Sequence, residues 1–209
     1  MSTINHIISD AWFNHINELS GGDGVINYSF RDKGISKKEK KFIRKTFDDI
    51  DELTGLKFKE THKNEDDLRF FSTHRIDEDT YFEFDDQHAH PHKHKHKHKH
   101  KHKHFDDQEL MIEDAIIGRA SARHNRVKIF WRDDDASLDY IEKYALLHEI
   151  GHSLGLSHPE GDGWNPDYTS ADTIMSYNIW GNGFFMYYGF CDLDKQALQH
   201  YWGPNPDMF

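Results

Sequence analysis

The chain lacks several features that would assign a protein to a class at once. A single cysteine, Cys191, excludes an internal disulfide framework among the 209 residues. No run approaches eighteen consecutive apolar residues, which argues against a transmembrane helix. The first twenty residues lack both a basic stretch and an uninterrupted apolar stretch, so they do not have the pattern of a signal peptide. The length is sufficient for one well-buried core.

Basic residues are scarce once one unusual segment is set aside. Lys and Arg number 26 against 37 Asp and Glu, which gives a formal net charge of -11. Six of the lysines lie in a histidine–lysine tract at 88–104, so 20 basic residues elsewhere face all 37 acidic ones. This acidic balance argues against nucleic acid or an anionic membrane surface as a partner.

The histidine–lysine tract, HAHPHKHKHKHKHKHKH, contains nine of the 18 histidines. Alternating His and Lys has no apolar face and cannot bury enough surface to become ordered. The sequence FDDQ stands directly before the tract and again directly after it, as if a dipeptide repeat had expanded inside a surface loop. We therefore interpret about 85–108 as a disordered insertion. It could bind extra metal ions weakly and in many registers, so metal buffering stays open as a second role.

The rest of the chain mixes strand patterns with helix patterns. Short runs rich in strand-forming residues predict strands at 25–30, 56–60, 67–72 and 127–131. SKKE at 36–39 is a capping box, and apolar residues recur behind it at helical spacing until Gly55, which predicts a helix. Asp139, with Glu142 three residues later, predicts the start of another helix, which leads into a histidine motif.

That motif is HEIGHSLGLSH, which begins at His148. His148 and His152 are one helical turn apart and project from the same face, as two ligands of one metal ion must. Glu149 lies beside them, where it could take a proton from a water at the metal. Gly155 lets the chain leave the helix sharply, and His158 can return as a third ligand. Three protein nitrogens leave one coordination position open, which is typical of catalytic rather than structural zinc.

HEIGHSLGLSH resembles the long zinc-binding consensus of the metzincin peptidases. Pro159 after the third histidine and TIMSYN at 173–178 are similar to the serralysins, which are M10 peptidases. The segment DLDKQALQHYWGPN at 192–205 resembles the last helix of their catalytic domain, and NYSF at 27–30 and TGLKFKE at 54–60 fit its opening strands. The resemblance covers most of residues 25–205, closely after 140 and loosely before.

The resemblance implies an α+β metzincin (zincin-like) fold, with a twisted mixed sheet, an active-site helix and a small C-terminal lobe. It divides the chain into an N-terminal segment at 1–24 and an upper lobe at 25–158 that contains the insertion. A lower lobe at 159–209 would contain the Met-turn and the C-terminal helix. Zinc would lie at the floor of the cleft between the two lobes.

The resemblance also implies one catalytic zinc ion held by three histidines: His148, His152 and His158. Glu149 would be the general base and acid, and Met175 would form a hydrophobic floor beneath the metal. Tyr177 would ligate the zinc ion and swing away to stabilise the transition state. An ordinary core role for Met175 and a buried structural role for Tyr177 are the alternatives.

These residues predict a zinc-dependent endopeptidase that acts on proteins or peptides. We expect an extended substrate to pair with a sheet edge near IGRASAR at 117–123. The alternatives are a non-catalytic zinc-binding or zinc-buffering protein and an interaction module on a metzincin scaffold. An intact Glu149 argues against both, because this carboxylate has no role in merely holding zinc.

The sequence differs from the serralysins in two respects. Serralysins usually end in glycine-rich calcium-binding repeats that serve export, and here GGDG at 21–24 is only a lone fragment. The sequence therefore supports neither calcium sites nor that export route, and the location of the protein stays open although the resemblance suggests an extracellular one. We also expect no longer N-terminal pro-segment of the kind the family has, so any latency would depend on residues 1–24.

Overall fold

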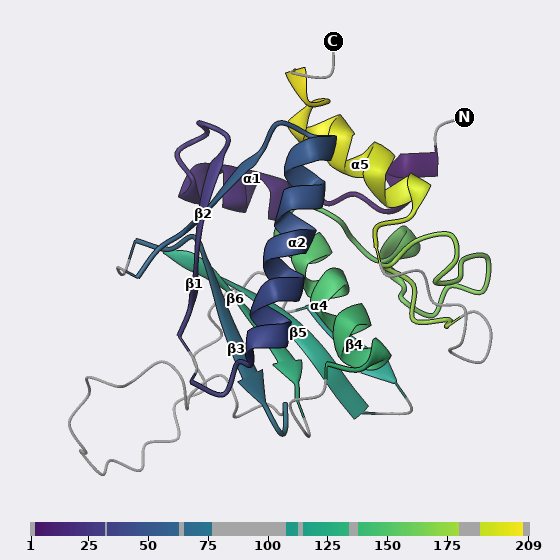
Figure 1. The fold of residues 1–209 in the computed structure, drawn as a ribbon. Helices are drawn as coiled ribbons and strands as arrows, with labels where there is room; N and C mark the ends of the chain where they lie inside the picture. The colour runs from purple at the N-terminus through teal and green to yellow at the C-terminus, as the bar shows by residue number, and fades with distance from the viewer. Residues whose placement is uncertain are drawn as a thin grey trace, which may run out of the picture.

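One mixed sheet of six strands forms the centre of the protein (Figure 1). The computed structural model describes residues 3–31, 33–62, 65–76, 108–112, 115–133, 138–179 and 189–206. The strands lie in the order β2-β1-β3-β6-β5-β4. Their bounds are β1 Val25–Phe30, β2 Lys57–Glu60, β3 Leu68–Thr73, β4 Gln108–Ile112, β5 Ala115–Arg123 and β6 Arg126–Arg132. Strands β2, β1, β3 and β6 run parallel, whereas β5 is antiparallel to both β6 and β4.

The four predicted strands are confirmed as β1, β2, β3 and β6, with each end within one residue of its predicted position. The predicted disordered insertion at about 85–108 lies outside the described residues, except that β4 begins at Gln108.

The predicted position of the free sheet edge is wrong. The sequence predicts it near 117–123, but β4 pairs with β5 between Ala115 and Ala120 and places Leu110 opposite Gly118. Gln108 falls in the predicted insertion, and no strand is predicted between that insertion and β5, so the sequence gives no sign of this pairing. Beside β5, the outermost described strand is therefore β4.

The described residues form four α-helices and two short 3₁₀ turns. These are α1 Asp10–Leu19, α2 Lys37–Leu53, α4 Tyr140–Ser153, α5 Asp192–Trp202, η1 Thr3–His6 and η2 Pro159–Gly161. None of the helices in the described residues combines the length and apolar character needed to cross a lipid bilayer.

Both predicted capping boxes are present at the starts of α2 and α4. The Ser36 hydroxyl accepts the Glu39 N–H at 3.2 Å, and the Glu39 carboxylate accepts the Ser36 N–H in return. Asp139 and Glu142 make the same reciprocal pair at 2.9 and 2.6 Å. Because the first turn of a helix leaves its N–H groups without helical partners, these bonds explain why both helices begin where the sequence predicts.

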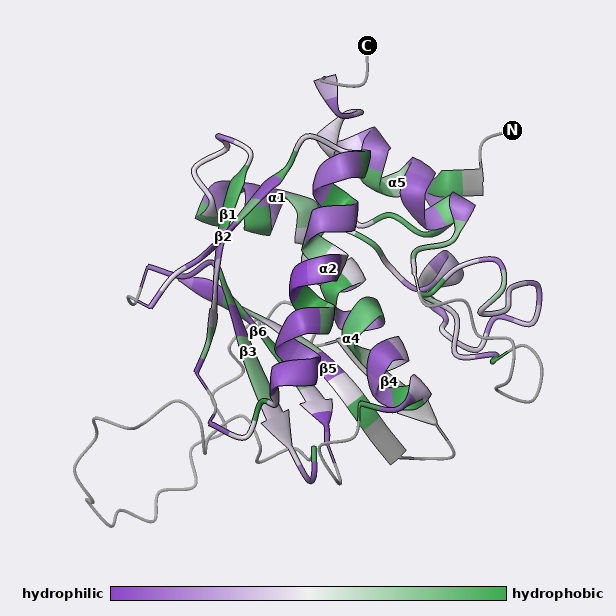
Figure 2. Ribbon diagram, in the orientation of Figure 1, coloured by the Kyte–Doolittle hydropathy of each residue, from purple (hydrophilic) through white to green (hydrophobic). Residues whose placement is uncertain are grey.

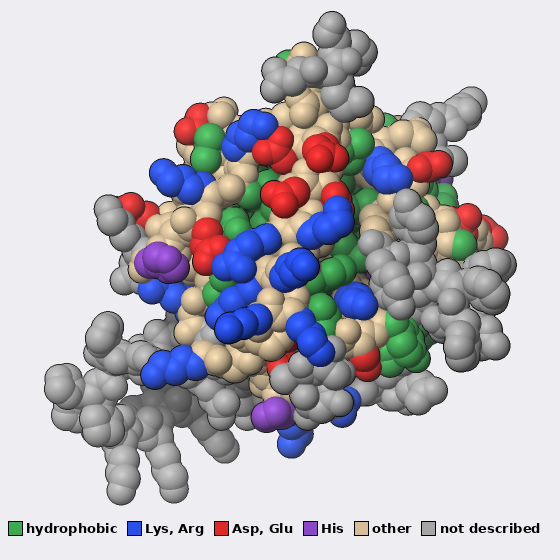
Figure 3. Space-filling view, viewed as in Figure 1, with side chains coloured by type: hydrophobic (Ala, Val, Ile, Leu, Met, Phe, Trp, Pro, Cys, Tyr) green, Lys and Arg blue, Asp and Glu red, His purple; other side chains and the backbone are tan. Residues whose placement is uncertain are grey.

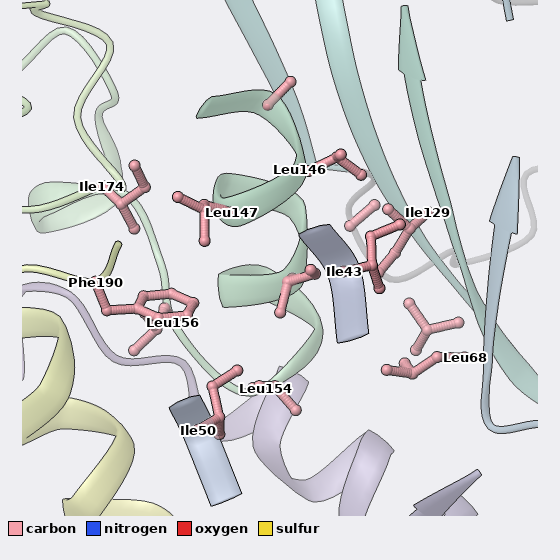
Figure 4. Close-up of a cluster of buried hydrophobic side chains, with 14 of the residues drawn as sticks. Ile43, Ile50, Leu68, Ile129, Leu146, Leu147, Leu154, Leu156, Ile174 and Phe190 are labelled. Atoms are coloured by element: carbon pink, nitrogen blue, oxygen red, sulfur yellow. The ribbon is translucent and has the colours of Figure 1, made fainter. Parts of the chain in front are cut away.

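Helices α2 and α4 cover one face of the sheet (Figure 1). Helix α2 is amphipathic: hydrophobic and hydrophilic residues alternate along its ribbon (Figure 2), and Ile43, Phe47 and Ile50 are buried. Lys, Arg, Asp and Glu side chains gather over its outer face (Figure 3). Helix α4 is buried on all sides from Tyr144 to Ser153. Figure 4 shows the reason, because Leu146 lies towards Ile129 of β6 while Leu147 lies towards Ile174 on the opposite side.

The N-terminal residues pack into the same core as the sheet and helices. Ile7 is fully buried, and Trp12 of α1 is nearly so. Ile8 forms an antiparallel bridge with Leu156, and the flanking Ser157 N–H donates to the Ile7 carbonyl at 2.8 Å. This pairing ties the N-terminal segment to the chain that leaves α4.

Candidate metal centre

Helix α4 places two histidines on one face, as their spacing predicts. His148 and His152 are both fully buried, and their Nε2 atoms lie 3.0 Å apart. The helix ends at Ser153, and Gly155 has a φ of +106°, a value that L side chains rarely adopt. A Cβ atom at Gly155 would also lie 2.9 Å from the Tyr201 ring. Glycine is therefore the residue that permits the sharp exit from α4.

His158 returns to the other two histidines after this turn. Its Nε2 atom lies 3.2 Å from that of His148 and 3.1 Å from that of His152. The three nitrogens thus form a nearly equilateral triangle. Within the residues that the structure describes, this is the one group of His, Cys, Asp or Glu side chains arranged to hold a metal ion.

The triangle fits a zinc ion. Zinc–nitrogen bonds of about 2.0–2.1 Å in a tetrahedral site would separate the ligand nitrogens by roughly 3.3 Å. The opposite ring nitrogens face carbonyl groups: His148 Nδ1 lies 2.9 Å from the Ile174 oxygen, and His152 Nδ1 lies 3.0 Å from the Leu156 oxygen. A carbonyl can only accept, so both Nδ1 atoms carry the proton. The Nε2 lone pairs of His148 and His152 therefore face the centre of the triangle.

Burial keeps these histidines neutral at physiological pH. It lowers the pKa of His158 to about 4. Burial, followed by the neighbouring histidine rings, lowers the pKa values of His148 and His152 well below 6.5. A metal ion binds the neutral form of imidazole. The three histidines can therefore bind a metal ion without first losing protons.

Glu149 extends from α4 towards the sheet. Its side chain is fully buried, and its carboxylate lies against Gly118 of β5. A Cβ atom built on Gly118 would be only 2.6 Å from Glu149 Oε1. The predicted general base therefore lies between the histidine-bearing helix and strand β5 of the sheet.

The TIMSYN segment passes beside α4 and brings two predicted residues to the histidines. Met175 is fully buried, and its sulfur would lie 2.9 Å from a Cβ atom at Gly151, between the two histidines of the helix. The Tyr177 hydroxyl lies 2.8 Å from His158 Nε2. This hydroxyl thus reaches a nitrogen that faces the centre of the triangle, whereas Met175 packs against the helix.

The family model of the matrixins, which are M10 peptidases, matches residues 24–171. The chain belongs to the matrixin family. This membership confirms the α+β metzincin fold and supports a metallopeptidase in general, in a family that typically uses zinc and acts on proteins or peptides. The match includes the complete histidine motif but ends before Met175 and Tyr177, so it does not distinguish a serralysin-like subgroup. A search of curated proteins finds no match.

In this matrixin, one buried acid that the sequence interpretation missed orders the TIMSYN segment. Asp194 of α5 accepts the Ile174 N–H at 3.0 Å and the Thr173 hydroxyl at 2.5 Å. The carbonyl of the same Ile174 faces His148 Nδ1. Burial raises the pKa of Asp194 to about 6. The acidic first turn of the predicted C-terminal helix was the available signal, but it does not reveal which backbone groups the carboxylate accepts.

Tyr144 and Trp164 are further residues near the matrixin site that the sequence interpretation did not single out. The Tyr144 hydroxyl, on α4, donates to the Ser176 carbonyl and so joins the helix to the TIMSYN segment. Trp164 packs edge-on against Tyr177, with 5.4 Å between ring centroids, yet 49% of its surface is exposed. Trp164 therefore forms part of the solvent-facing rim beside the histidines.

Proposed function

We propose that the protein is a zinc-dependent endopeptidase with a serralysin-like site. The observation that carries the proposal is the convergence of three histidine Nε2 atoms within 3.0–3.2 Å of one another, with the Tyr177 hydroxyl 2.8 Å from one of them. An intact, fully buried Glu149, which follows His148 directly on α4, supports catalysis over simple metal storage.

In this proposal His148, His152 and His158 hold one zinc ion. When bound, zinc supplies the Lewis acidity that activates water and polarises the carbonyl of the peptide bond. Glu149 takes the proton of the attacking water and delivers it to the leaving amine. The Tyr177 hydroxyl donates a hydrogen bond to the negative charge that develops on the carbonyl oxygen. Met175 packs beneath the ligands and takes no part in proton transfer.

The substrates in this proposal are proteins or peptides in extended form. Because β4 pairs with β5 beside Glu149, a substrate strand would add to β4 rather than to β5. Sheet addition recognises the main chain, so the proposal assigns no side-chain preference.

Digestion of casein and of a peptide library by the purified full chain tests the proposal. We expect cleavage that a chelator abolishes and that added zinc restores, together with one tightly bound zinc ion per chain. The Glu149→Gln protein is the matched control, because it should hold the same zinc ion and cleave orders of magnitude more slowly. A zinc-loaded wild type that cleaves none of these unfolded substrates would instead favour the zinc-binding or interaction-module alternative.

Deletion of 88–104 separates the two possible metal sites. We propose that the tract binds additional metal ions weakly, whereas the triangle binds one ion tightly. The shortened chain should therefore keep one tight zinc ion and lose only weak, variable binding. Loss of the tight ion would show that the tract is the principal metal site, and would contradict the proposed zinc centre.

A further inference from the structure

Gly118 occupies a position in β5 where the backbone does not require glycine. Its φ lies outside the left-handed region in which other glycines of the chain are found. Glycine weakens the interior of a strand because it has no side chain to pack. Ala120 and Ala122 follow it on the same face of β5, and each buries a methyl group in the core. Residue 118 therefore differs from its neighbours on this face of β5, because it alone lacks a methyl group.

The space at Gly118 is filled by the side chain of Glu149. A Cβ atom on Gly118 would lie 2.6 Å from Oε1, 3.0 Å from Cγ and 3.2 Å from Cδ of Glu149. These distances extend over much of the glutamate side chain, so a small rotation of the carboxylate alone would not clear the methyl group. A closely approaching group is a common reason for glycine inside a strand.

Neither side of this contact can easily move away. Gly118 is paired on both sides, with Trp131 of β6 and with Leu110 of β4. Glu149 is fully buried, and it follows His148 directly on a helix that is itself buried on all sides. Close-packed interiors transmit such a conflict instead of absorbing it. The sheet therefore sets how far the Glu149 side chain can extend towards β5.

We propose that Gly118 is a positioning residue for Glu149. Its missing side chain leaves the room in which the carboxylate rests, and its backbone is the wall that fixes the position of that carboxylate relative to the histidines. The catalytic consequence depends on the proposed function, because it requires Glu149 to be the general base. The steric coupling between the two residues does not depend on catalysis and can be measured by itself.

Melting temperatures of the full chain test the steric coupling. Gly118→Ala should lower the melting temperature of the wild type by a few degrees, roughly 2–4 °C for each kcal/mol lost in a chain of this size. In a Glu149→Ala background the same change should be neutral or should raise the melting temperature, because the methyl group then has room and alanine favours the strand. Equal shifts in the two backgrounds would overturn the proposal.

Ala120→Gly is the matched control on the same face of β5. It removes a methyl group and introduces no clash, so it should lower the melting temperature by a similar amount in both backgrounds. The change in melting temperature caused by Gly118→Ala should reverse its sign between the two backgrounds, whereas that caused by Ala120→Gly should not. This result would assign the coupling to the contact with Glu149.

Kinetics and metal content then test the positioning role. Gly118→Ala should lower kcat on the order of 10- to 100-fold, leave KM nearly unchanged and retain one zinc ion per chain. A thermal coupling with an unchanged kcat would overturn the positioning role. A wild type without peptidase activity would refute the proposed function instead, and the melting experiment would still decide whether Gly118 makes room for Glu149.

Discussion

The candidate site joins two regions that are built differently. Helix α4 supplies His148, Glu149 and His152 from one regular element whose backbone hydrogen bonds repeat at every turn. The segment from 154 to 179 supplies His158 and Tyr177, and its only regular element is the short turn η2. Repeating backbone hydrogen bonds hold the residues of α4 in place. The segment from 154 to 179 lacks such a repeat, so other interactions must hold His158 and Tyr177.

Side-chain hydrogen bonds provide that order in the second region. The Asn178 amide donates to the carbonyls of Asn165 and Tyr168 at 2.8 and 3.1 Å, and the Ser176 hydroxyl donates to the Tyr168 carbonyl at 3.0 Å. Asp194 adds the contacts that hold Ile174. Because each of these bonds involves one specific side chain, substitution should disturb this region more readily than the exposed surface of a helix.

The largest expected effect comes from the helical region. Glu149→Gln keeps the size of the side chain and removes its ability to accept a proton, so kcat should fall roughly 10²- to 10⁴-fold. Peptide hydrolysis and metal analysis check the result, and zinc content and melting temperature should stay near those of the wild type. Full activity in this variant would rule out Glu149 as the general base.

Tyr177→Phe tests the segment that returns to the helix. Loss of one hydrogen-bond donor to the transition state should lower kcat on the order of 10²-fold and change KM much less. Steady-state kinetics on a defined peptide measure both constants. Three histidines still hold the metal, so zinc should remain bound. An unchanged kcat would make Tyr177 structural and would remove the serralysin-like part of the proposal.

Asp194→Ala should weaken the second region without touching a metal ligand. The change leaves the Thr173 hydroxyl and the N–H groups of Ile174 and Cys191 without their buried acceptor, which should cost about 2–4 kcal/mol of unfolding free energy. Zinc should also pass to a chelator faster, because Ile174 faces His148. Denaturant unfolding and metal-transfer rates measure the two effects.

Asp192→Ala is the control for Asp194→Ala, since Asp192 lies on the same helix and is exposed. Its effect should stay within about 0.5 kcal/mol. If both variants lost a similar amount of unfolding free energy, the substitutions would be disturbing the helix as a whole and not the contact with Ile174.

The smallest expected effect is a change in pH dependence at the start of α4. Burial raises the pKa of Glu142 to about 7, above its value of 4.5 in the unfolded chain. The raised pKa therefore adds to the free energy of unfolding. This addition is complete below about pH 4.5 and is lost as the pH rises through 7. Glu142→Gln stays neutral, so its stability should fall less between pH 5 and 8, by on the order of 1 kcal/mol. Parallel pH profiles of the two proteins would contradict this assignment.

Local patterns in the sequence were sufficient for the helical region. The two capping boxes place the starts of α2 and α4, because their hydrogen bonds join residues only three positions apart. The same short-range geometry brings His148 and His152 to one face. The spacing of HEIGHSLGLSH predicts the return of His158, whereas only the resemblance to a known family singles out Tyr177.

Only the tertiary structure decided how these parts meet. Pairing of β4 with β5 moved the sheet edge away from its predicted place, and it set Leu110 opposite Gly118. Asp194 reaches Ile174 across 20 positions of the sequence, and Ile174 in turn faces His148 from 26 positions away. The fit of Glu149 against Gly118 likewise joins a helix to a strand. Spacing and capping rules act over one or two turns of chain, whereas these contacts exist only after the sheet and helices have packed, so no local pattern encodes them.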